Sequence, residues 1–438
     1  MKTTVLKFGG TSLADSGQFR KVAEIVKSDP ARRYVVASAP GKRFDGDIKV
    51  TDLLIDCYEL AKAGSDFEEN LMEIKDRFEE ITENLGVPFD MEPEMDLIRR
   101  NLKNYPSRSY ALSRGEYLNS KILAAYLGFS FVDPYYCIKF KAGGELDAHA
   151  TYTALHQKLS DLDHAVIAGF YGSGPDGNII TFSRGGSDIT GSLVAKAIGA
   201  DLYENWTDVS GLLAADPRII DNPRVVKYIS YRELRTLSYM GATVLHADAL
   251  LPVNQAEIPV NIRNTNDPEA PGTMIVSELP LEREKHTITG VAGRKGLSVI
   301  QIEKIMVSDG AGFTAVILDI FKAFGIPFEQ CLTGIDTVTV IVREDYMRDN
   351  KERLLDAIEE QLHPDTLFVR ENLAMIAVVG ESDADYQGST VCILGAVSDA
   401  GIELNTINQG GGSLNLIIGI NEADYEKAIA AIYNSITG

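Results

Sequence analysis

Strand and helix signals alternate through residues 1–265, and this alternation limits the possible fold more than any other feature of the chain. A helix is expected after the first strand, because apolar residues recur at helical spacing behind Asp15 and Ser16, which are good N-cap types. The apolar β-type runs occur at residues 3–6, 34–37, 165–168 and 178–181. This pattern predicts an α/β layered fold with a mainly parallel sheet. Because single cores stop growing beyond roughly 250–300 residues, a chain of 438 residues is expected to form more than one domain.

Charge and cysteine content narrow the class of protein. The net charge is −21 and no basic block offsets it, which argues against a nucleic-acid-binding surface. No apolar run approaches the length of a membrane span, and the N-terminus has no signal-peptide pattern. Cys57, Cys137, Cys331 and Cys392 are far apart, so we expect reduced thiols in a cytoplasmic protein. The six histidines do not cluster, and no metal site is predicted.

An internal repeat occupies the last third of the chain. Residues 324–328 align with residues 400–404, an offset of 76. Each copy reads as strand, helix, two strands, helix and strand, which predicts two ferredoxin-like units in tandem; a purely structural dimerisation unit is the alternative. The turn-rich segment 264–273 is predicted to be the domain boundary. We therefore expect domains at residues 1–265, 297–370 and 371–438, with a linker and connecting strand at 266–296.

Two glycine loops carry the strongest chemical signals. The first, residues 7–12 (Lys-Phe-Gly-Gly-Thr-Ser), follows a strand, so its N–H groups can approach a phosphate closely and Lys7 adds positive charge. It lacks P-loop spacing, and a plain strand-end turn is the alternative. The second, residues 183–188 (Ser-Arg-Gly-Gly-Ser-Asp), precedes a predicted helix at 191–198. There Arg184 offers a forked donor for a carboxylate, whereas Asp188 is either a site residue or an ordinary first-turn acid.

Three weaker signals lie between and beyond these loops. A glycine at position 115 inside a predicted helix indicates that something requires close approach there, and the adjacent Glu116 is a candidate for binding a cationic group. Residues 206–218 place Thr and Asp at a strand end, followed by Ala-Asp-Pro-Arg, which suits a nucleotide edge and its phosphates. Residues 172–177 match G-x-G-x-x-G, but a strand follows them, so we predict a hairpin and no dinucleotide site.

Taken in order, these motifs resemble the aspartate kinase family. The likeness rests on KFGGTS, SAPG, KVTD, SRGE, SRGGSD, WTDVSG, ADPR and GATVLH. It implies a three-layer amino-acid-kinase domain followed by two ferredoxin-like ACT domains, of the monofunctional type. The implied activity is transfer of the ATP γ-phosphoryl to the β-carboxylate of L-aspartate, with Mg²⁺ carried by ATP. This reaction would be the first step towards lysine, threonine and methionine.

The resemblance also implies roles for particular residues. Catalytic roles fall to Lys7, Arg184 and Asp188, and substrate-binding roles to Ser38, Thr51, Glu116, Arg184 and Ser187. The nucleotide side would comprise Lys7, Gly9, Gly10, Thr11, Ser12, Thr207, Asp208, Leu213, Asp216, Arg218, Thr243 and Val244. Two of these depart from the usual pattern, since Leu213 replaces a frequent tyrosine and Thr243 a usual lysine. The loss of a cation near the phosphates is expected to weaken ATP binding.

The ACT pair implies an amino-acid effector and a homodimer or a dimer of dimers. The implied effector site comprises Asp309, Gly312, Phe313, Thr314, Thr333 and Asp336. Lysine is favoured over threonine, because Asp336 is suited to a cationic side chain. Two alternatives stay open: a kinase of the same fold for another acid such as glutamate, and a catalytically silent ACT-domain sensor.

Overall fold

The computed structural model describes residues 2–183, 185–242, 245, 247–280, 288–305, 312–380, 389–410 and 414–437. The chain divides into two compact units. The first comprises Met1–Leu212, Val225–Arg235 and Thr243–Arg283, and the second comprises Leu213–Arg224, Thr236–Ala242 and Glu284–Gly438. This division differs from the predicted boundary at residue 265. The turn-rich segment joins two neighbouring strands of one sheet, β9 (Val260–Asn264) and β10 (Thr273–Val276).

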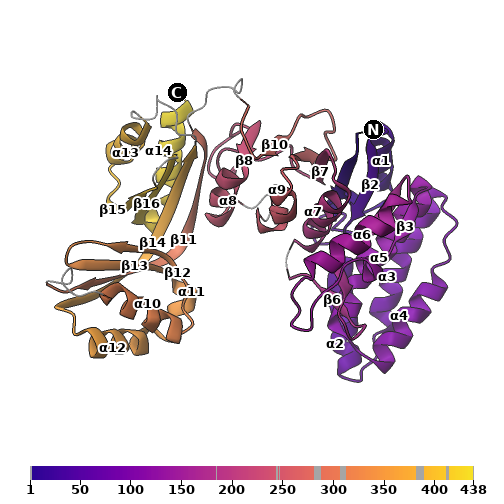
Figure 1. Cartoon of the computed structure of the whole chain (residues 1–438), viewed down its shortest axis with the longest axis horizontal. Coiled ribbons are helices and arrows are strands. Elements are labelled where there is room, and N and C mark those ends of the chain that lie inside the picture. Colours follow the sequence, from indigo (N-terminus) through magenta and orange to yellow (C-terminus); the bar gives the residue numbers. More distant parts are fainter. Residues whose placement is uncertain are drawn as a thin grey trace. The chain divides into compact units, whose positions relative to one another are not determined.

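Within the described part of the first unit, eight strands form one sheet in the order β3-β4-β2-β1-β7-β9-β10-β8 (Figure 1). Neighbouring strands are parallel except for β9 and β10, which confirms the prediction of a mainly parallel sheet. The other strands are β1 (Thr4–Phe8), β2 (Arg32–Ala37), β3 (Ser130–Val132), β4 (Ala165–Ala168), β7 (Leu202–Thr207) and β8 (Tyr228–Ser230). The carboxyl ends of β1, β2, β4 and β7 therefore meet at the same edge of the sheet, where α/β folds place their ligands.

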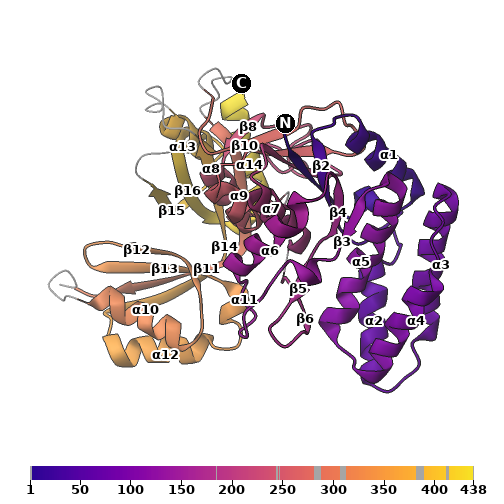
Figure 2. The same cartoon turned by 45° about the vertical axis from the view of Figure 1, so that its right-hand side comes forward.

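Helices cover both faces of this sheet. The helices α1 (Ser16–Lys27) and α5 (Arg108–Leu127) pack on one face, and α7 (Gly186–Ile198) packs against β1, β2 and β7 on the other. As predicted, Asp15 caps α1, because its carboxylate accepts a hydrogen bond from the Gln18 N–H at 2.9 Å. Figure 2 shows α2 (Val50–Lys62), α3 (Glu68–Leu85) and α4 (Glu92–Asn104) gathered beside α5. Their buried apolar sides form one core with the α1 face of the sheet.

Smaller elements complete the first unit. The strands β5 (Tyr171–Ser173) and β6 (Ile179–Thr181) pair in antiparallel fashion, so the glycine-rich segment between them is the predicted hairpin. The remaining short elements and helices are η1 (Thr11–Leu13), η2 (Pro134–Tyr136), α6 (Ala148–Ser160), η3 (Ala247–Leu250) and α9 (Leu251–Gln255). The helix α8 (Tyr231–Tyr239) begins in the first unit and ends in the second. The four cysteines are free thiols. None of the helices in the described ranges is long and apolar enough to cross a membrane.

The second unit is built on an antiparallel sheet, with six strands among its described residues in the order β12-β13-β11-β14-β16-β15. The strands are β11 (Ile288–Glu303), β12 (Phe328–Thr333), β13 (Thr337–Arg343), β14 (Thr366–Gly380), β15 (Leu404–Gln409) and β16 (Leu414–Asn421). The helices are α10 (Phe313–Ala323), α11 (Glu344–Met347), α12 (Lys351–Leu362), α13 (Ser389–Asp399) and α14 (Tyr425–Thr437), with η6 (Glu422–Asp424) before α14. Figure 1 shows α10 and α12 side by side, and α13 near α14.

Two long strands, β11 and β14, are shared by both ferredoxin-like copies. In the first copy, residues 297–303 pair with β13 and with residues 366–373. In the second copy, residues 373–380 pair with β16 and with residues 288–294. The second copy thus takes its fourth strand from a segment that precedes the first copy in the chain. The two ferredoxin-like copies are present as predicted, but the second copy was expected to end in a strand of its own. A strand from either end of a copy can close its sheet, and the repeat alone does not decide which one does.

Candidate active site

Lys7 and Asp188 form a nearly buried ion pair between β1 and the first turn of α7. The Lys7 ammonium nitrogen lies 2.6 Å from Asp188 Oδ1, and the two side chains are 11% and 14% exposed. Alternation along β1 sends Leu6 and Phe8 into the core on the α1 side, so Lys7 points to the face where α7 packs. A charge-assisted contact of this kind is strong. The pair therefore fixes an ammonium group at the sheet edge.

The first glycine loop packs against residues 39–41 so closely that position 10 has no room for a side chain. A Cβ on Gly10 would lie 2.9 Å from the Ala39 carbonyl oxygen, and a Cβ on Gly41 would lie 2.6 Å from the Gly10 carbonyl carbon. The Gly41 N–H donates to the Gly10 carbonyl at 2.7 Å. A Cβ on Gly9 would instead point to the Lys7 ammonium, 3.8 Å away. Close approach, and no positive φ, is therefore what requires glycine at position 10.

Two hydroxyls follow these glycines and face different surroundings. Thr11 is exposed. Ser12 is buried, and its hydroxyl accepts a hydrogen bond from the Thr265 hydroxyl at 2.8 Å. In this structure Ser12 therefore ties the loop to the segment after β9, and its predicted contact with a nucleotide stays a prediction.

The second glycine loop leads directly into α7. Gly185 is the N-cap, with φ 60°, a left-handed conformation that favours glycine. The helix begins at Gly186, earlier than the predicted start at residue 191, so Ser187 and Asp188 lie in its first turn. Unpaired N–H groups and the positive end of the helix dipole gather there. Arg184 lies outside the described residues, and its carboxylate-binding role stays a prediction.

Other predicted residues stand at neighbouring strand ends. Ser38 follows β2, and its N–H donates to the Phe8 carbonyl at 3.2 Å, beside the first glycine loop. Thr207 ends β7, and its hydroxyl donates to the Asp208 carboxylate at 3.2 Å. Thr51 is half-buried in the first turn of α2. The structure therefore places Ser38 next to the first glycine loop, and Thr207 and Asp208 at the end of the strand that pairs with β1.

Glu116 is a buried acid on α5 near the 38–41 loop. A Cβ on Gly115 would lie 2.8 Å from the Ala39 Cβ, so close approach of that loop explains the glycine inside the helix. Burial raises the pKa of Glu116 to about 8, although the N–H groups of Glu116 and Ala39 and the Arg114 guanidinium favour its charged form. Among the described residues, Glu116 Oε2 has no hydrogen-bond partner. An ammonium group bound here would supply both a donor and a countercharge.

The sequence of this chain is similar to those of known kinases. The model of the amino acid kinase family matches residues 2–264, and an ACT domain model matches residues 376–436. Aspartokinase 3 of Bacillus subtilis is 38% identical over 98% of this chain and 97% of its own length. The chain belongs to the aspartokinases of the amino acid kinase family.

Solved aspartokinase structures match the chain over its whole length. Aspartate kinase of Clostridium acetobutylicum superposes with a TM-score of 0.90 at 42% identity, covering 100% of both chains. Aspartokinase III of Escherichia coli, in complex with aspartate and ADP, gives a TM-score of 0.77 at 26% identity and the same coverage. Its complex with lysine and aspartate gives 0.74 at 25% identity, again covering both chains fully.

In this aspartokinase, the residues predicted to contact ATP fall in both compact units. The first unit holds Thr207 and Asp208, and the second holds Leu213, Asp216 and Arg218. Arg218 pairs with Asp216 at 2.6 Å, and this hydrogen bond lowers the pKa of the Asp216 carboxyl. Thr243 and Val244 lie outside the described residues. Their nucleotide-binding roles stay predictions.

The residues predicted to bind an effector belong to the first ferredoxin-like copy of the aspartokinase. Gly312 caps α10 with φ 112°, and Phe313 and Thr314 are the first residues of that helix. Thr333 ends β12, and the half-buried Asp336 lies in the turn before β13. Asp309 lies outside the described residues. The structure therefore places these groups at the start of α10 and at the β12–β13 turn.

Two buried amides beside the aspartokinase site were not predicted. Asn205 on β7 donates to Asp188 Oδ1 at 2.8 Å. The same oxygen also contacts the Lys7 ammonium. Asn119 on α5 donates to the Ser38 carbonyl at 2.7 Å. The signal for Asn119 was its position three residues after Glu116, on the same helix face. Asn205 lies directly across from Lys7, but only the order of the strands reveals that pairing.

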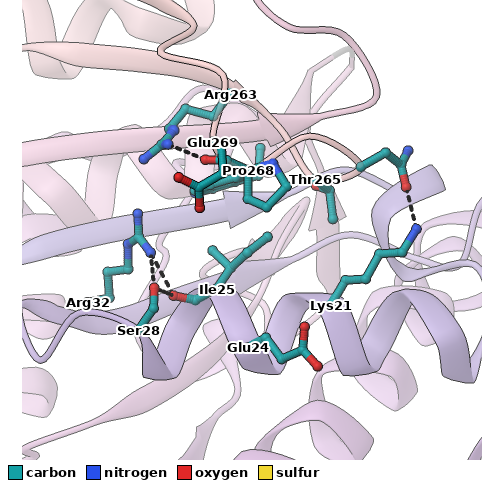
Figure 3. Close-up of a pocket in the computed structure, with 11 residues that line it drawn as sticks. Lys21, Glu24, Ile25, Ser28, Arg32, Arg263, Thr265, Pro268 and Glu269 are labelled. Carbon is teal, nitrogen blue, oxygen red and sulfur yellow. Dashed lines mark hydrogen bonds between the residues drawn. The ribbon is translucent and has the colours of Figure 1, made fainter.

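A pocket of about 490 Å³ lies on the opposite face of the sheet, beside α1 (Figure 3). Trp206 lines it and stacks on Phe8, whereas the neighbouring Asn205 points to the Lys7 side. Its charged lining consists of Lys21, Arg32, Arg263, Glu24 and Glu269. Because Glu204 also pairs with both arginines, cations and acids are balanced. This pocket therefore lacks the excess positive charge that a polyphosphate requires.

Proposed function

We propose that this aspartokinase transfers the γ-phosphoryl of ATP to the β-carboxylate of L-aspartate, giving 4-phospho-L-aspartate and ADP. The observation that carries the proposal is the Lys7–Asp188 pair, held at 2.6 Å between two glycine loops at the carboxyl edge of the sheet. The carboxyl pKa of aspartate is about 3.9, so the acceptor is already an anion at neutral pH. The site therefore needs positioning and charge neutralisation rather than a general base.

Each group in this arrangement has a distinct task. A carboxylate oxygen of aspartate forms a bond to the γ-phosphorus while the bond from that phosphorus to the bridging oxygen of ADP breaks. The Lys7 ammonium lies beside Gly9 and stabilises the negative charge shared by the two anions. Asp188 holds that ammonium in place, and Glu116 receives the ammonium of aspartate. Mg²⁺ arrives on the phosphates of ATP and neutralises part of their charge.

The reaction product gives a direct test. Incubation with ATP, Mg²⁺ and aspartate is expected to form an acyl phosphate that hydroxylamine traps as aspartyl hydroxamate. Glutamate in place of aspartate is expected to yield little product. A chain that formed no hydroxamate would be a sensor, and one that preferred glutamate would be a kinase for another acid.

Lysine is proposed as the effector, acting through the ferredoxin-like copies. One support is the solved complex of Escherichia coli aspartokinase III with lysine and aspartate. The other is the Asp336 carboxylate, which directly precedes β13. The N–H groups at the start of α10 suit the effector carboxylate. Millimolar lysine is therefore expected to reduce hydroxamate formation, with threonine less effective.

Asp336→Asn provides the matched variant for the lysine prediction. Hydrogen bonds to charged groups contribute about 1.5–3 kcal/mol, so the lysine concentration for half-inhibition is expected to rise roughly tenfold or more. Activity without lysine is expected to stay the same. Undiminished activity of the unmodified chain at millimolar lysine would reject the assignment.

A homodimer, or a dimer of dimers, is proposed to form through the ferredoxin-like unit. Its two edge strands, β12 and β15, carry the exposed apolar residues Phe328 and Ile407, which are 42% and 48% exposed. An uncovered edge of this kind is a ready template for pairing with another chain.

The four free thiols fit a reducing cytoplasm as the place where the enzyme works.

A further inference from the structure

Arg77 on α3 is a buried cation, and its partners among the described residues all belong to one loop, residues 41–48. Its guanidinium donates to the carbonyls of Gly41 and Ile48, the latter at 2.7 Å, and lies 3.4 Å from the Asp47 carboxylate. The side chain is only 4% exposed. A buried charge is tolerated when it is paired and hydrogen-bonded, so these three contacts hold the loop in one arrangement.

The same loop interlocks with the first glycine loop. The Gly41 carbonyl accepts a hydrogen bond from the Arg77 guanidinium, and the Gly41 N–H donates to the Gly10 carbonyl at 2.7 Å. A Cβ on Gly41 would also lie 2.6 Å from the Thr11 nitrogen, so the two backbones are in direct contact. Any displacement of Gly41 is therefore passed to the residues that follow Lys7.

We propose that Arg77 is a positioning residue for phosphoryl transfer, acting through Gly41 on the Gly9–Gly10 backbone. The helical segment that contains α3 and α4 then serves as the support of the glycine loop rather than as packing alone. The inference rests on the proposed function in one respect, since it takes this loop as the cradle of the transferring phosphoryl. Misplacement by about 1 Å far from the chemistry can cost roughly 10²-fold in rate.

The planar fork of arginine is essential to this arrangement. It reaches two carbonyls and a carboxylate at once, whereas the lysine ammonium is a point charge on a flexible stem. Arg43 supplies a matched control, because it belongs to the same loop, its side chain is 30% exposed, and it binds Asp47 at 2.9 Å and Glu80 at 3.2 Å. Arg43→Gln thus removes an ion pair to Asp47 and leaves both carbonyls with Arg77.

The experiment compares Arg77→Met, Arg77→Lys and Arg43→Gln by steady-state kinetics and by hydrogen exchange of the Gly41 amide. Arg77→Met is expected to lower kcat about 10–100-fold, with KM for ATP and aspartate changed less than threefold. The Gly41 amide is expected to exchange at least tenfold faster, while the amides of β1 and β4 keep their protection. Arg77→Lys is expected to lower kcat more than twofold but less than Arg77→Met does, and Arg43→Gln to keep kcat within twofold.

Two results would overturn the inference. One is a kcat within twofold of the unmodified chain in folded Arg77→Met or, if that variant does not fold, in Arg77→Lys. The other is unchanged protection of the Gly41 amide in the variant that folds. Failure of the proposed function looks different, because the unmodified chain would then form no aspartyl hydroxamate while the exchange of Gly41 still responded to Arg77.

Discussion

Replacing Lys7 with methionine is expected to lower kcat for aspartyl phosphate formation roughly 10²–10³-fold, the usual loss when one preorganised donor to a developing charge is removed. The ammonium is held 2.6 Å from Asp188 and beside Gly9, so its loss removes a fixed positive charge from the end of β1. The KM for aspartate is expected to change little, because Lys7 acts on the charge that moves between donor and acceptor. Initial rates of hydroxamate formation measure both quantities.

Two companion variants separate charge stabilisation from simple packing. Asn205→Ala removes the second donor to Asp188 but leaves the ion pair, so a loss of less than about tenfold is expected, in line with one ordinary hydrogen bond. Lys7→Met combined with Asp188→Asn avoids leaving a carboxylate unpaired. If the double variant recovered the original kcat, the pair would be structural only and the assigned role of Lys7 would be wrong.

Local patterns predicted the parts of this site that depend on one segment alone. Gly115 was recognised because a glycine within a helix indicates close approach, and a Cβ there would meet Ala39. Gly10 was singled out for the approach of a phosphate, which stays a prediction, and the structure adds its close packing against residues 39–41. The alternation of elements likewise predicted the mainly parallel sheet. Asn205 and Arg77 were missed for a different reason. Their roles depend on which strand lies beside β1 and on what α3 packs against, and neither fact is written in the spacing of residues.

The repeat shows the same limit on a larger scale. It located both ferredoxin-like copies, since the internal similarity reflects the shared order of strands and helices. It did not reveal that residues 288–294 close the sheet of the second copy. That pairing is long-range, and its strand lies ahead of the first copy. The effect is to insert the first copy into the second, so that β11 and β14 connect them through continuous backbone.

Glu116 is expected to make aspartate binding depend on pH in the neutral range. Burial raises the pKa of its carboxyl to about 8, from an ordinary value of 4.5. In the free enzyme below pH 8 the group is therefore mostly protonated, whereas the ammonium of bound aspartate favours the charged form and lowers the pKa in the complex. Binding then releases a proton. The kcat/KM for aspartate should rise up to about tenfold per pH unit between pH 6 and 8, and level off above that.

Glu116→Gln is the control that isolates this group. The variant keeps the size of the side chain and cannot ionise. Because it loses a charge-assisted hydrogen bond to the substrate ammonium, its kcat/KM for aspartate at pH 8.5 should be about 10–100-fold below that of the unmodified chain. Any change of kcat/KM with pH that Glu116→Gln retains between pH 6 and 8 comes from ATP or from other residues. This change is subtracted from the profile of the unmodified chain. Parallel profiles for the two proteins would show that Glu116 does not receive the ammonium.

The same substitution should affect stability in the opposite direction. A carboxyl whose pKa is higher in the folded protein than in the unfolded chain contributes stability below pH 4.5, which is lost as the pH rises towards 8. At pH 8 and above, the free enzyme holds a buried carboxylate whose Oε2 has no hydrogen-bond partner in the described part of the chain, and Glu116→Gln removes that charge. Its melting temperature should therefore exceed that of the unmodified chain at pH 8.5 and approach it at pH 5. A gain in stability together with a loss of aspartate binding is the signature of a group placed for its ligand rather than for the fold.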